Sequence, residues 1–281
     1  MTEFRPSRFE ILPTIVKNLL IINGLFFLAQ KSLGGGLNPA IDFDNLFALH
    51  AWQSPLFKPW QLLTHMFMHA NFSHILGNMF GLWMFGSVLE NVWGSKRFLT
   101  FYLICGLGAA LIHLLFLSYE LVPLMKQYDN LSALHMTASP ELTEAIMRFA
   151  RAQEMPFAND PQLNSWLRLN PADPAITRQL YETVTTYYQQ RLNTATLGAS
   201  GAVFGVLAAF VYLFPNTYIY LYFLVPIKAK WLGLIYFTYE VFFAIQNSAG
   251  DNVARWAHIG GALVGLLIVI TWNKTNRRTM Y

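Results

Sequence analysis

The chain contains long apolar runs that are separated by short polar connections and by one long polar stretch. Six runs approach the roughly 17 to 25 apolar residues that cross a bilayer as a helix: 12–30, 74–90, 98–117, 200–214, 230–246 and 254–272. The fourth run is the shortest, and the apolar residues 218–227 that follow it are compatible with a re-entrant hairpin. The pattern therefore predicts an all-α polytopic membrane protein with six transmembrane helices.

The long polar stretch, residues 119–195, separates the third predicted span from the fourth. Within it, three residues suited to a helix N-cap stand directly before a proline: Ser139, Asp160 and Asp173. Apolar residues then recur at helical spacing, as in Leu142, Ile146 and Phe149. We therefore expect this stretch to be a small helical insertion.

The composition supports a membrane protein and argues against a nucleic-acid-binding one. Of the 281 residues, 54% are hydrophobic and 12% are charged, whereas a soluble domain carries about 25% charged residues. The net charge is +4, but the basic residues form no patch, so membrane topology explains them better than nucleic-acid binding does. The single cysteine, Cys105, lies in an apolar run and cannot form an intrachain disulfide.

Lysine and arginine residues in the short connections predict the orientation of the spans. Those on the side of the two termini are Arg5, Arg8, Lys17, Lys96, Arg97, Lys228, Lys230, Lys274, Arg277 and Arg278. Those in the short connections of the other side are Lys31, Lys58 and Arg255. We therefore expect both termini in the cytoplasm, with the insertion on the opposite side of the inner (plasma) membrane. The expected parts are 1–118 (three spans and a membrane-associated first loop), 119–195 (the insertion) and 196–281 (three spans and a basic tail).

The first candidate for chemistry is Gly198-Ala199-Ser200-Gly201, where the insertion ends and the fourth span begins. Ser200 lies there at a predicted helix N-terminus, where free backbone N–H groups and the helix dipole favour a developing oxyanion. The glycines on both sides allow a peptide backbone to approach. The alternative is that Ser200 is an ordinary N-cap residue, which is the commonest role of serine at such a boundary.

The second candidate is His258 in the sixth predicted span, for which the alternative role is a structural hydrogen bond. Two glycines four residues apart follow each candidate: Gly201 and Gly205 after Ser200, and Gly261 and Gly265 after His258. Small residues at this spacing let helices pack closely in a bilayer. If the two glycine faces meet, the histidine reaches the serine and the two form a nucleophile and its base.

The third candidate is a polar pair at the start of the second predicted span. His74 and Asn78 are four residues apart and share a helical face, from which both side chains can donate hydrogen bonds to an oxyanion. His65 and His69 show the same spacing, which leaves a metal site as the alternative. Neither begins an H-E-x-x-H pattern and no nearby acid or thiolate completes a ligand set, so we expect no metal and no cofactor.

Two glutamates also lie in predicted spans, Glu90 at the end of the second and Glu240 within the fifth. A buried acid can serve in a proton relay, which would suit a transporter. We favour the simpler interpretation, in which each glutamate caps a helix or pairs with a neighbouring base such as Lys96.

In this order along the chain, the motifs resemble those of the rhomboid family of intramembrane serine proteases. The matching stretches are His65-Met66-Phe67-Met68-His69, His74-Ile75-Leu76-Gly77-Asn78, 198–201, Ala257-His258 with Gly261 and Gly265, 226–231 and 250–252. The resemblance implies that Ser200 is the nucleophile and His258 the general base, with no aspartate to complete a triad. It also implies that His74, Asn78 and the Ser200 N–H hold the oxyanion, with Gly198 at the substrate-binding site. The implied partners are single-span membrane proteins and the lipid bilayer.

Three features depart from the family pattern. Phe204 stands where many members have a tyrosine, so that ring packing on His258 is kept and a phenol hydrogen bond is lost. Gln61 follows Trp60 where some members have arginine. The insertion replaces a short connection, and we expect it either to select substrates or to serve folding or oligomerisation. The alternative function is a catalytically inactive rhomboid-like protein that binds membrane clients, although loss of the serine or histidine would be its expected signature.

Overall fold

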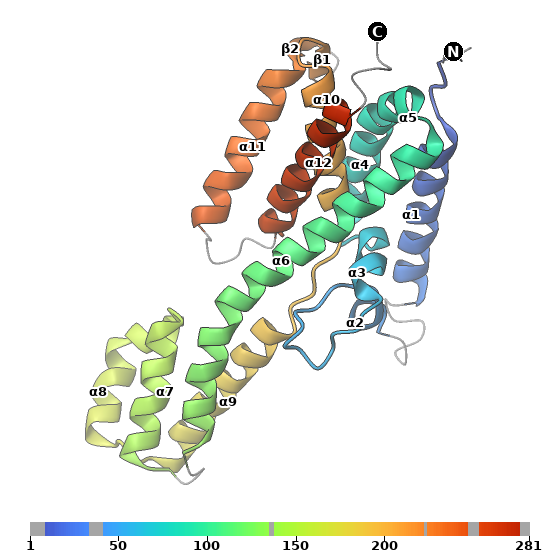
Figure 1. Ribbon diagram of the computed structural model, residues 1–281. Coiled ribbons are helices and arrows are strands. Elements are labelled where there is room, and N and C mark those ends of the chain that lie inside the picture. The colour runs from blue at the N-terminus through green and yellow to red at the C-terminus, as the bar shows by residue number, and fades with distance from the viewer. Residues whose placement is uncertain (1–8, 34–41, 135–137, 222–223, 247–252, 276–281) are drawn as a thin grey trace. The chain divides into compact units, whose positions relative to one another are not determined.

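The computed structural model describes residues 9–33, 42–134, 138–221, 224–246 and 253–275, which form helices and one β-hairpin (Figure 1). The chain divides into two compact units. The membrane unit comprises Met1–His50, Leu56–Phe116 and Ala195–Tyr281. The insertion unit comprises Leu117–Thr194 together with Ala51–Pro55, a short piece of the first loop.

Each predicted span is helical in the structure. The helices are α1 (Thr14–Leu33), α4 (Phe72–Gly81) continued by η2 (Leu82–Gly86) and α5 (Ser87–Trp93), α6 (Ser95–Ser132), α10 (Ser200–Leu213), α11 (Ala229–Gln246) and α12 (Arg255–Thr275). Successive spans of the membrane unit run in opposite directions, so that α1 begins and α12 ends at the same end of this unit (Figure 1).

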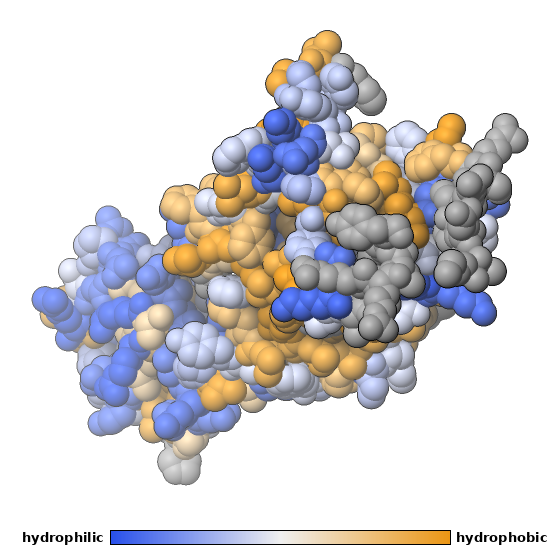
Figure 2. Space-filling view, turned by 45° about the horizontal axis from the view of Figure 1, so that its top comes forward, coloured by the Kyte–Doolittle hydropathy of each residue, from blue (hydrophilic) through white to orange (hydrophobic). Residues whose placement is uncertain are grey.

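Length and hydropathy mark three of these helical stretches, among the described residues, as able to cross a membrane: Phe72–Trp93, Ser95–Ser132 and Arg255–Lys274. Helix α10 is apolar but shorter, as the sequence predicted for the fourth span. Large apolar side chains such as Leu115, Ile245 and Leu267 are exposed on the membrane unit. Hydrophobic residues dominate the visible surface of this unit, whereas the insertion unit is mostly hydrophilic (Figure 2). An apolar exterior of this kind suits contact with lipid.

Helix α6 is longer than the third predicted span. It continues beyond residue 117 to Ser132 and contains Pro123. Charged residues such as Glu120 and Lys126 end the apolar run there, but they are good helix formers and do not end the helix. The end predicted at residue 117 is that of the apolar span, and the helix continues beyond it, because hydropathy reports the environment of a helix and not its length.

The insertion unit is helical, and its helices begin where the sequence predicted. They are α7 (Pro140–Ala152), the 3₁₀ turn η3 (Pro156–Asn159), α8 (Pro161–Leu169) and α9 (Pro174–Leu192). The side chains of Ser139, Asp160 and Asp173 accept hydrogen bonds from backbone N–H groups in the first turns of α7, α8 and α9. The three predicted N-caps are thus confirmed.

The insertion unit has a hydrophobic core of its own. Ile146 and Val184 are fully buried in it, and Tyr128 stacks on Tyr188 with ring centroids 3.9 Å apart. Apolar faces of α7 and α9 supply much of this core, as their helical spacing indicated.

Residues Ala51–Pro55, although they belong to the first loop, pack within the insertion unit. Gln53 Nε2 donates a hydrogen bond to Ser118 Oγ at 2.8 Å, and Ser54 Oγ donates to Asn193 Oδ1 at 2.7 Å. Ala51 is buried in the same core. The sequence did not predict this association, because residues so far apart show no local pattern.

The rest of the first loop is built around Gln61. The loop contains α2 (Phe43–Phe47), α3 (Gln61–Thr64) and the 3₁₀ turn η1 (His65–Phe67). The buried Gln61 side chain accepts hydrogen bonds from the N–H groups of His50 and Lys58 and donates to the carbonyls of Asn45 and Leu56. This residue therefore fixes the loop through four backbone groups.

After α10, the strands β1 (Tyr218–Leu221) and β2 (Val225–Lys228) pair in antiparallel orientation. The sequence suggested a re-entrant hairpin in this region, and the hairpin found consists of strands. The side chains of Tyr220 and Val225 are exposed on it.

Helices α10 and α12 pack through glycines that we call the glycine seam: Gly201, Gly205, Gly261 and Gly265. A Cβ atom on Gly261 would overlap the carbonyl oxygen of Gly201, and one on Gly265 would lie 2.6 Å from the carbonyl oxygen of Gly205. Such distances admit only a residue without a side chain, so the two backbones touch directly. The two glycine faces therefore meet, which is the condition that the sequence set for a contact between His258 and Ser200.

Candidate active site

Ser200 and His258 are in contact at one end of the glycine seam. Ser200 is the first residue of α10, and His258 lies in the first turn of α12. The distance from His258 Nε2 to Ser200 Oγ is 2.7 Å, which is a hydrogen bond. Ala199 is the N-cap residue of α10, so the alternative that Ser200 serves as the cap is wrong. Because the backbones of the two helices are in close contact, the side chains of Ser200 and His258 can reach each other.

The other ring nitrogen of His258 faces an acid that the sequence did not place in the site. Nδ1 of His258 lies 3.1 Å from Oε2 of Glu240, a residue of α11 that is 3% exposed. An ionised carboxylate only accepts hydrogen bonds, so with Glu240 in that form the proton of this contact is on Nδ1. Nε2 is then left to accept a hydrogen bond from the hydroxyl of Ser200.

Glu240 also pairs with a base, as expected from the sequence, but the base is Arg255. The guanidinium NH1 of Arg255 lies 3.4 Å from Oε2 of Glu240, and both side chains are buried. Arg255 is placed over the rings of Tyr239 and Phe243 in α11. The sequence contained a signal for this pair, because an acid lies within one predicted span and a base at the start of the next. Arg255 was interpreted there only as evidence for the orientation of the spans.

Glu90, the other glutamate in the spans, has a different role. Its carboxylate accepts hydrogen bonds from the backbone N–H groups of Ile15 and Val16 in the first turn of α1, and from the hydroxyl of Ser95. The interpretation of Glu90 as a helix cap is confirmed. Its partners belong to the junction of α1, α5 and α6, and none of the residues of the Ser200 site is among them.

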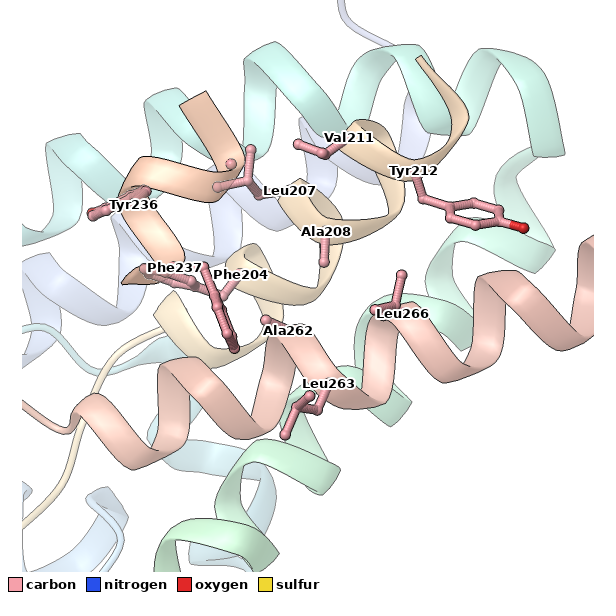
Figure 3. Close-up of a pocket in the computed structure, with 11 residues that line it drawn as sticks. Phe204, Leu207, Ala208, Val211, Tyr212, Tyr236, Phe237, Ala262, Leu263 and Leu266 are labelled. Atoms are coloured by element: carbon pink, nitrogen blue, oxygen red, sulfur yellow. The ribbon is translucent and has the colours of Figure 1, made fainter. Parts of the chain in front are cut away.

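Phe204 holds the ring of His258 from one side. The two rings are stacked with centroids 4.3 Å apart and planes 9° apart, which confirms the predicted ring packing. Phe204 also contacts Tyr236 of α11 and lines an apolar cavity of about 360 Å³ between α10, α11 and α12 (Figure 3). The imidazole is therefore held by a stacking contact on its face and by hydrogen-bond contacts at both nitrogens.

Two of the residues predicted to hold the oxyanion, His74 and Ser200, lie close to Gly198. This glycine has φ of +130°, and a Cβ there would be 2.9 Å from Nε2 of His74 and 3.5 Å from Oγ of Ser200. Only glycine suits this conformation and this space. The N–H of Gly198 donates to the carbonyl of His65 at 2.9 Å, which ties the segment before Ser200 to the first loop.

Asn78 follows His74 by one turn on α4 and is buried. Its Nδ2 has no hydrogen-bond partner among the residues that the structure describes. A buried donor without a partner is uncommon in proteins and is expected where a ligand oxygen binds. The structure gives Asn78 a free donor and brings His74 to the segment that carries Ser200.

His65 and His69 are buried in the first loop and contribute no charge at neutral pH. Burial lowers the pKa of each to about 4, and His65 Nδ1 lies 2.8 Å from the carbonyl oxygen of Gln61. In the described part of the chain, no group of three or more histidine, cysteine, aspartate or glutamate residues is arranged to hold a metal ion. In the loop, the neutral His65 therefore forms a hydrogen bond to the backbone, whereas the ring of His69 packs against that of His74.

The family model described as "Rhomboid domain" matches residues 56–125 and 176–274, which together are more than half of the chain. The matched residues include His65 and His69 of the first loop, the whole of α10 and α11, and α12 up to Lys274. Most of the insertion, residues 126–175, lies outside the match. The family has a polytopic all-α membrane fold, in agreement with the fold predicted from the sequence and with the helices described above.

Curated proteins similar to the chain are rhomboid proteins. An uncharacterized mitochondrial rhomboid protein of Schizosaccharomyces pombe is 28% identical over 99% of this chain and 69% of its own length. The mitochondrial RHOMBOID-like protein 12 of Arabidopsis thaliana is 24% identical over 77% of this chain and 46% of its own length. Rhomboid protease GluP of Bacillus subtilis is 29% identical over 38% of this chain and 21% of its own length.

Proposed function

The chain belongs to the rhomboid family, and on that premise we propose that it is an intramembrane serine endopeptidase whose catalytic residues are Ser200 and His258. The observation that carries the proposal is the 2.7 Å contact between Ser200 Oγ and His258 Nε2. A serine hydroxyl is a weak nucleophile unless an adjacent base accepts its proton. The name of the Bacillus subtilis relative, a rhomboid protease, supports the same activity.

In the acylation step, Ser200 Oγ attacks the carbonyl carbon of the scissile peptide bond while its proton moves to His258 Nε2. The tetrahedral intermediate then collapses, the C–N bond breaks, and His258 returns the proton to the leaving amine. The products of this step are the amine fragment and an ester between the other fragment and Ser200.

The negative charge of the intermediate falls on the former carbonyl oxygen. His74, Asn78 and the backbone N–H of Ser200 are the proposed donors to this oxygen, because they lie near the N-terminus of α10 or have an unused donor. Each such donor contributes about 10² to 10³ in rate in other serine proteases. Gly198 leaves room for the substrate backbone between His74 and Ser200.

Water completes the reaction. His258 accepts a proton from a water molecule, whose oxygen attacks the ester carbonyl, and the proton then passes to Ser200 Oγ as the second fragment leaves. Ser200 is the first residue of α10 and His258 lies in the first turn of α12, so the proposed reaction takes place at helix ends and not in mid-span. Such a position eases the access of water to the ester.

The proposed substrates are membrane proteins with a single transmembrane helix, cleaved within or beside that helix. A helical peptide bond is shielded by its neighbours, so the substrate must unwind locally before attack. Helix-breaking residues near the scissile bond therefore favour cleavage, because glycine and proline reduce the cost of unwinding.

The chain is a multi-pass membrane protein, and the distribution of basic residues supports an orientation with both termini in the cytoplasm. We propose the inner (plasma) membrane as its location. Two of the relatives named above are mitochondrial proteins, so a mitochondrial membrane is the competing location.

A catalytically inactive rhomboid-like protein remains the second candidate function. The presence of both Ser200 and His258, in hydrogen-bond contact, favours the protease. A transporter that uses both glutamates is less well supported, because the Glu90 carboxylate is engaged in capping α1.

The test is cleavage of a panel of single-span membrane proteins by the purified protein in liposomes. We expect the wild type to cleave at least one substrate, and Ser200→Ala and His258→Ala to cleave none at a detectable rate. Equal cleavage by the wild type and Ser200→Ala would refute the serine mechanism. Loss of cleavage with a chelator and its recovery with zinc would indicate a metalloprotease instead.

The insertion is proposed to select substrates, since its chain leads directly into the segment that carries Ser200. Replacing residues 119–195 by a short linker should change which members of the panel are cleaved. An unchanged pattern with unchanged rates would show that the insertion serves folding or oligomerisation.

A further inference from the structure

The contact between His258 and Glu240 carries an inference that rests on the proposed function. The carboxylate is on α11 and the imidazole on α12, and the atoms Oε2 and Nδ1 are 3.1 Å apart. Both side chains are buried, with 3% of Glu240 and 8% of His258 exposed. A buried acid costs free energy unless it has partners, so its place beside the imidazole calls for a role.

We propose that Glu240 is a positioning residue of the active site, which holds the imidazole of His258 in the orientation and tautomer that serve Ser200. With Glu240 as acceptor, the Nδ1 proton points to α11 and the lone pair of Nε2 points to the hydroxyl of Ser200. The site is then a chain of three side chains, from Ser200 through His258 to Glu240.

Glu240 also stabilises the positive charge that develops on His258 during the reaction. When the Ser200 proton moves to Nε2, the imidazole becomes a cation with a proton on each nitrogen. The Nδ1 proton stays on the imidazole, and the carboxylate stabilises the cation without taking a proton. When His258 gives the proton to the leaving amine, the pair returns to its first state.

Arg255 holds Glu240 in this place. The guanidinium is 3.4 Å from the same oxygen, Oε2, that faces His258, and it packs over Tyr239 and Phe243. The carboxylate therefore joins α11 to the start of α12 through two partners. The charge of Arg255 opposes that of Glu240, so the acid is not an isolated charge in an apolar surrounding.

Other titratable groups also surround the pair, and they set the background for any pH measurement. They are Ser200 of α10, Tyr236 and Tyr239 of α11, Arg255 of α12, His74 of α4 and His113 of α6. Among the described residues around His258, Glu240 is the only acid with a contact to its ring.

The experiment measures the rate at which a fluorophosphonate modifies Ser200 between pH 4.5 and pH 9, in the full-length protein in detergent. Exchange of the acid for its amide in proteases of the Ser-His-Asp type lowers kcat by about 10⁴-fold, because the wrong imidazole tautomer is favoured. We expect Glu240→Gln to lower the modification rate at least about 100-fold, and to move the acidic limb of the pH profile to lower pH. The limb moves this way because the imidazolium loses the anion that stabilises it.

Glu90→Gln is the matched control, since it makes the same chemical change at another buried glutamate of the spans. It should lower stability through loss of the cap on α1 and leave the pH profile of the folded fraction unchanged. Glu240→Asp retains the charge, so the acidic limb of its pH profile should lie at the same pH as that of the wild type. The rate of Ser200 modification should fall about tenfold, because the shorter side chain moves the carboxylate away from His258.

The outcomes separate the two proposals. If the wild type is not modified at Ser200, the proposed function fails. If the wild type is modified and Glu240→Gln has a rate within threefold of it and the same acidic limb, only the role of Glu240 fails. If Glu240→Gln does not fold, Glu240→Asp decides the question: a rate about tenfold below that of the wild type supports the role, and a wild-type rate contradicts the expected dependence of the rate on the distance between the carboxylate and His258.

Discussion

The glycine seam of the membrane unit and the helices of the insertion unit show two ways of holding helices in place. At the seam, α10 and α12 touch through backbone atoms, and Gly261 leaves no room for even one methyl group. In the insertion, apolar faces pack on one another and side-chain caps fix the helix starts. The geometry of the proposed active site depends on the first kind, because Ser200 and His258 meet only if the backbones do. The second kind tolerates small changes in position.

The largest expected effect is at the seam. Gly261→Ala places a Cβ on the carbonyl oxygen of Gly201, which only a shift of one helix can relieve. Overpacking costs about 1 to 3 kcal/mol where side chains can adjust, and a backbone collision should exceed that range. We expect a loss of more than about 3 kcal/mol in unfolding free energy and loss of activity, measured by thermal unfolding in detergent and by substrate cleavage.

Gly24→Ala is the control, because a Cβ at this helical position of α1 has no atom within 4 Å. Alanine there should raise stability by about 0.4 to 1 kcal/mol. Similar stabilities for the two variants would contradict a direct backbone contact at the seam.

Acidification should destabilise the membrane unit through His65. The pKa of this buried histidine is about 4 in the folded protein, against 6.5 for the ordinary side chain, so the unfolded chain binds its proton first as the pH falls. The stability contributed by the neutral form is complete above pH 6.5 and is lost between 6.5 and about 4. At pH 5 the loss from His65 is about 2 kcal/mol.

Thermal unfolding at pH 7 and pH 5 checks this expectation. His65→Gln keeps a hydrogen-bonding side chain and has no proton to gain, so its unfolding should depend less on pH than that of the wild type. The same loss of stability in both proteins would contradict the prediction.

Removal of the ring that stacks on His258 should have a moderate effect on activity. An aromatic pair of this kind is worth about 0.5 to 1.5 kcal/mol beyond its buried area. Phe204→Leu should therefore lower kcat/KM about 2- to 10-fold, whereas Phe204→Tyr, which retains the stacked ring, should stay within about twofold. Equal activities of the leucine and wild-type enzymes would show that the other contacts of His258 suffice to hold it.

The smallest effect on catalysis is expected in the insertion. Ser139→Ala removes the cap of α7 and should cost about 1 kcal/mol of local stability. Hydrogen exchange of α7 should become faster, while cleavage of a given substrate changes less than twofold. Ser165→Ala, an exposed position within α8, is the control. A large loss of activity in Ser139→Ala alone would mean that catalysis depends on the start of α7.

Local patterns account for what could be predicted from the sequence. Apolar runs marked the spans, prolines after capping residues marked the starts of α7, α8 and α9, and glycine spacing indicated the seam. Each of these signals lies within one continuous segment of the chain. The contact of Ser200 with His258 followed from the seam and from the family resemblance together.

The features that the sequence did not predict depend on contacts between distant segments of the chain. The place of Glu240 depends on how α11 is rotated against α12, and hydropathy does not report rotation. The association of Ala51–Pro55 with the insertion unit joins residues 53 and 118, and 54 and 193. The length of α6 was missed because its polar end is helical for reasons of propensity and packing, neither of which marks a membrane span.

The most direct test of the account is to locate the nucleophile by mass spectrometry after treatment with a fluorophosphonate. We expect one adduct, on Ser200, in the wild type, none in Ser200→Ala, and modification at least about 100-fold slower in His258→Ala. Ser87→Ala, which alters another buried serine of the spans, should react like the wild type. An adduct on a residue other than Ser200, or equal rates in the wild type and His258→Ala, would contradict a serine activated by His258.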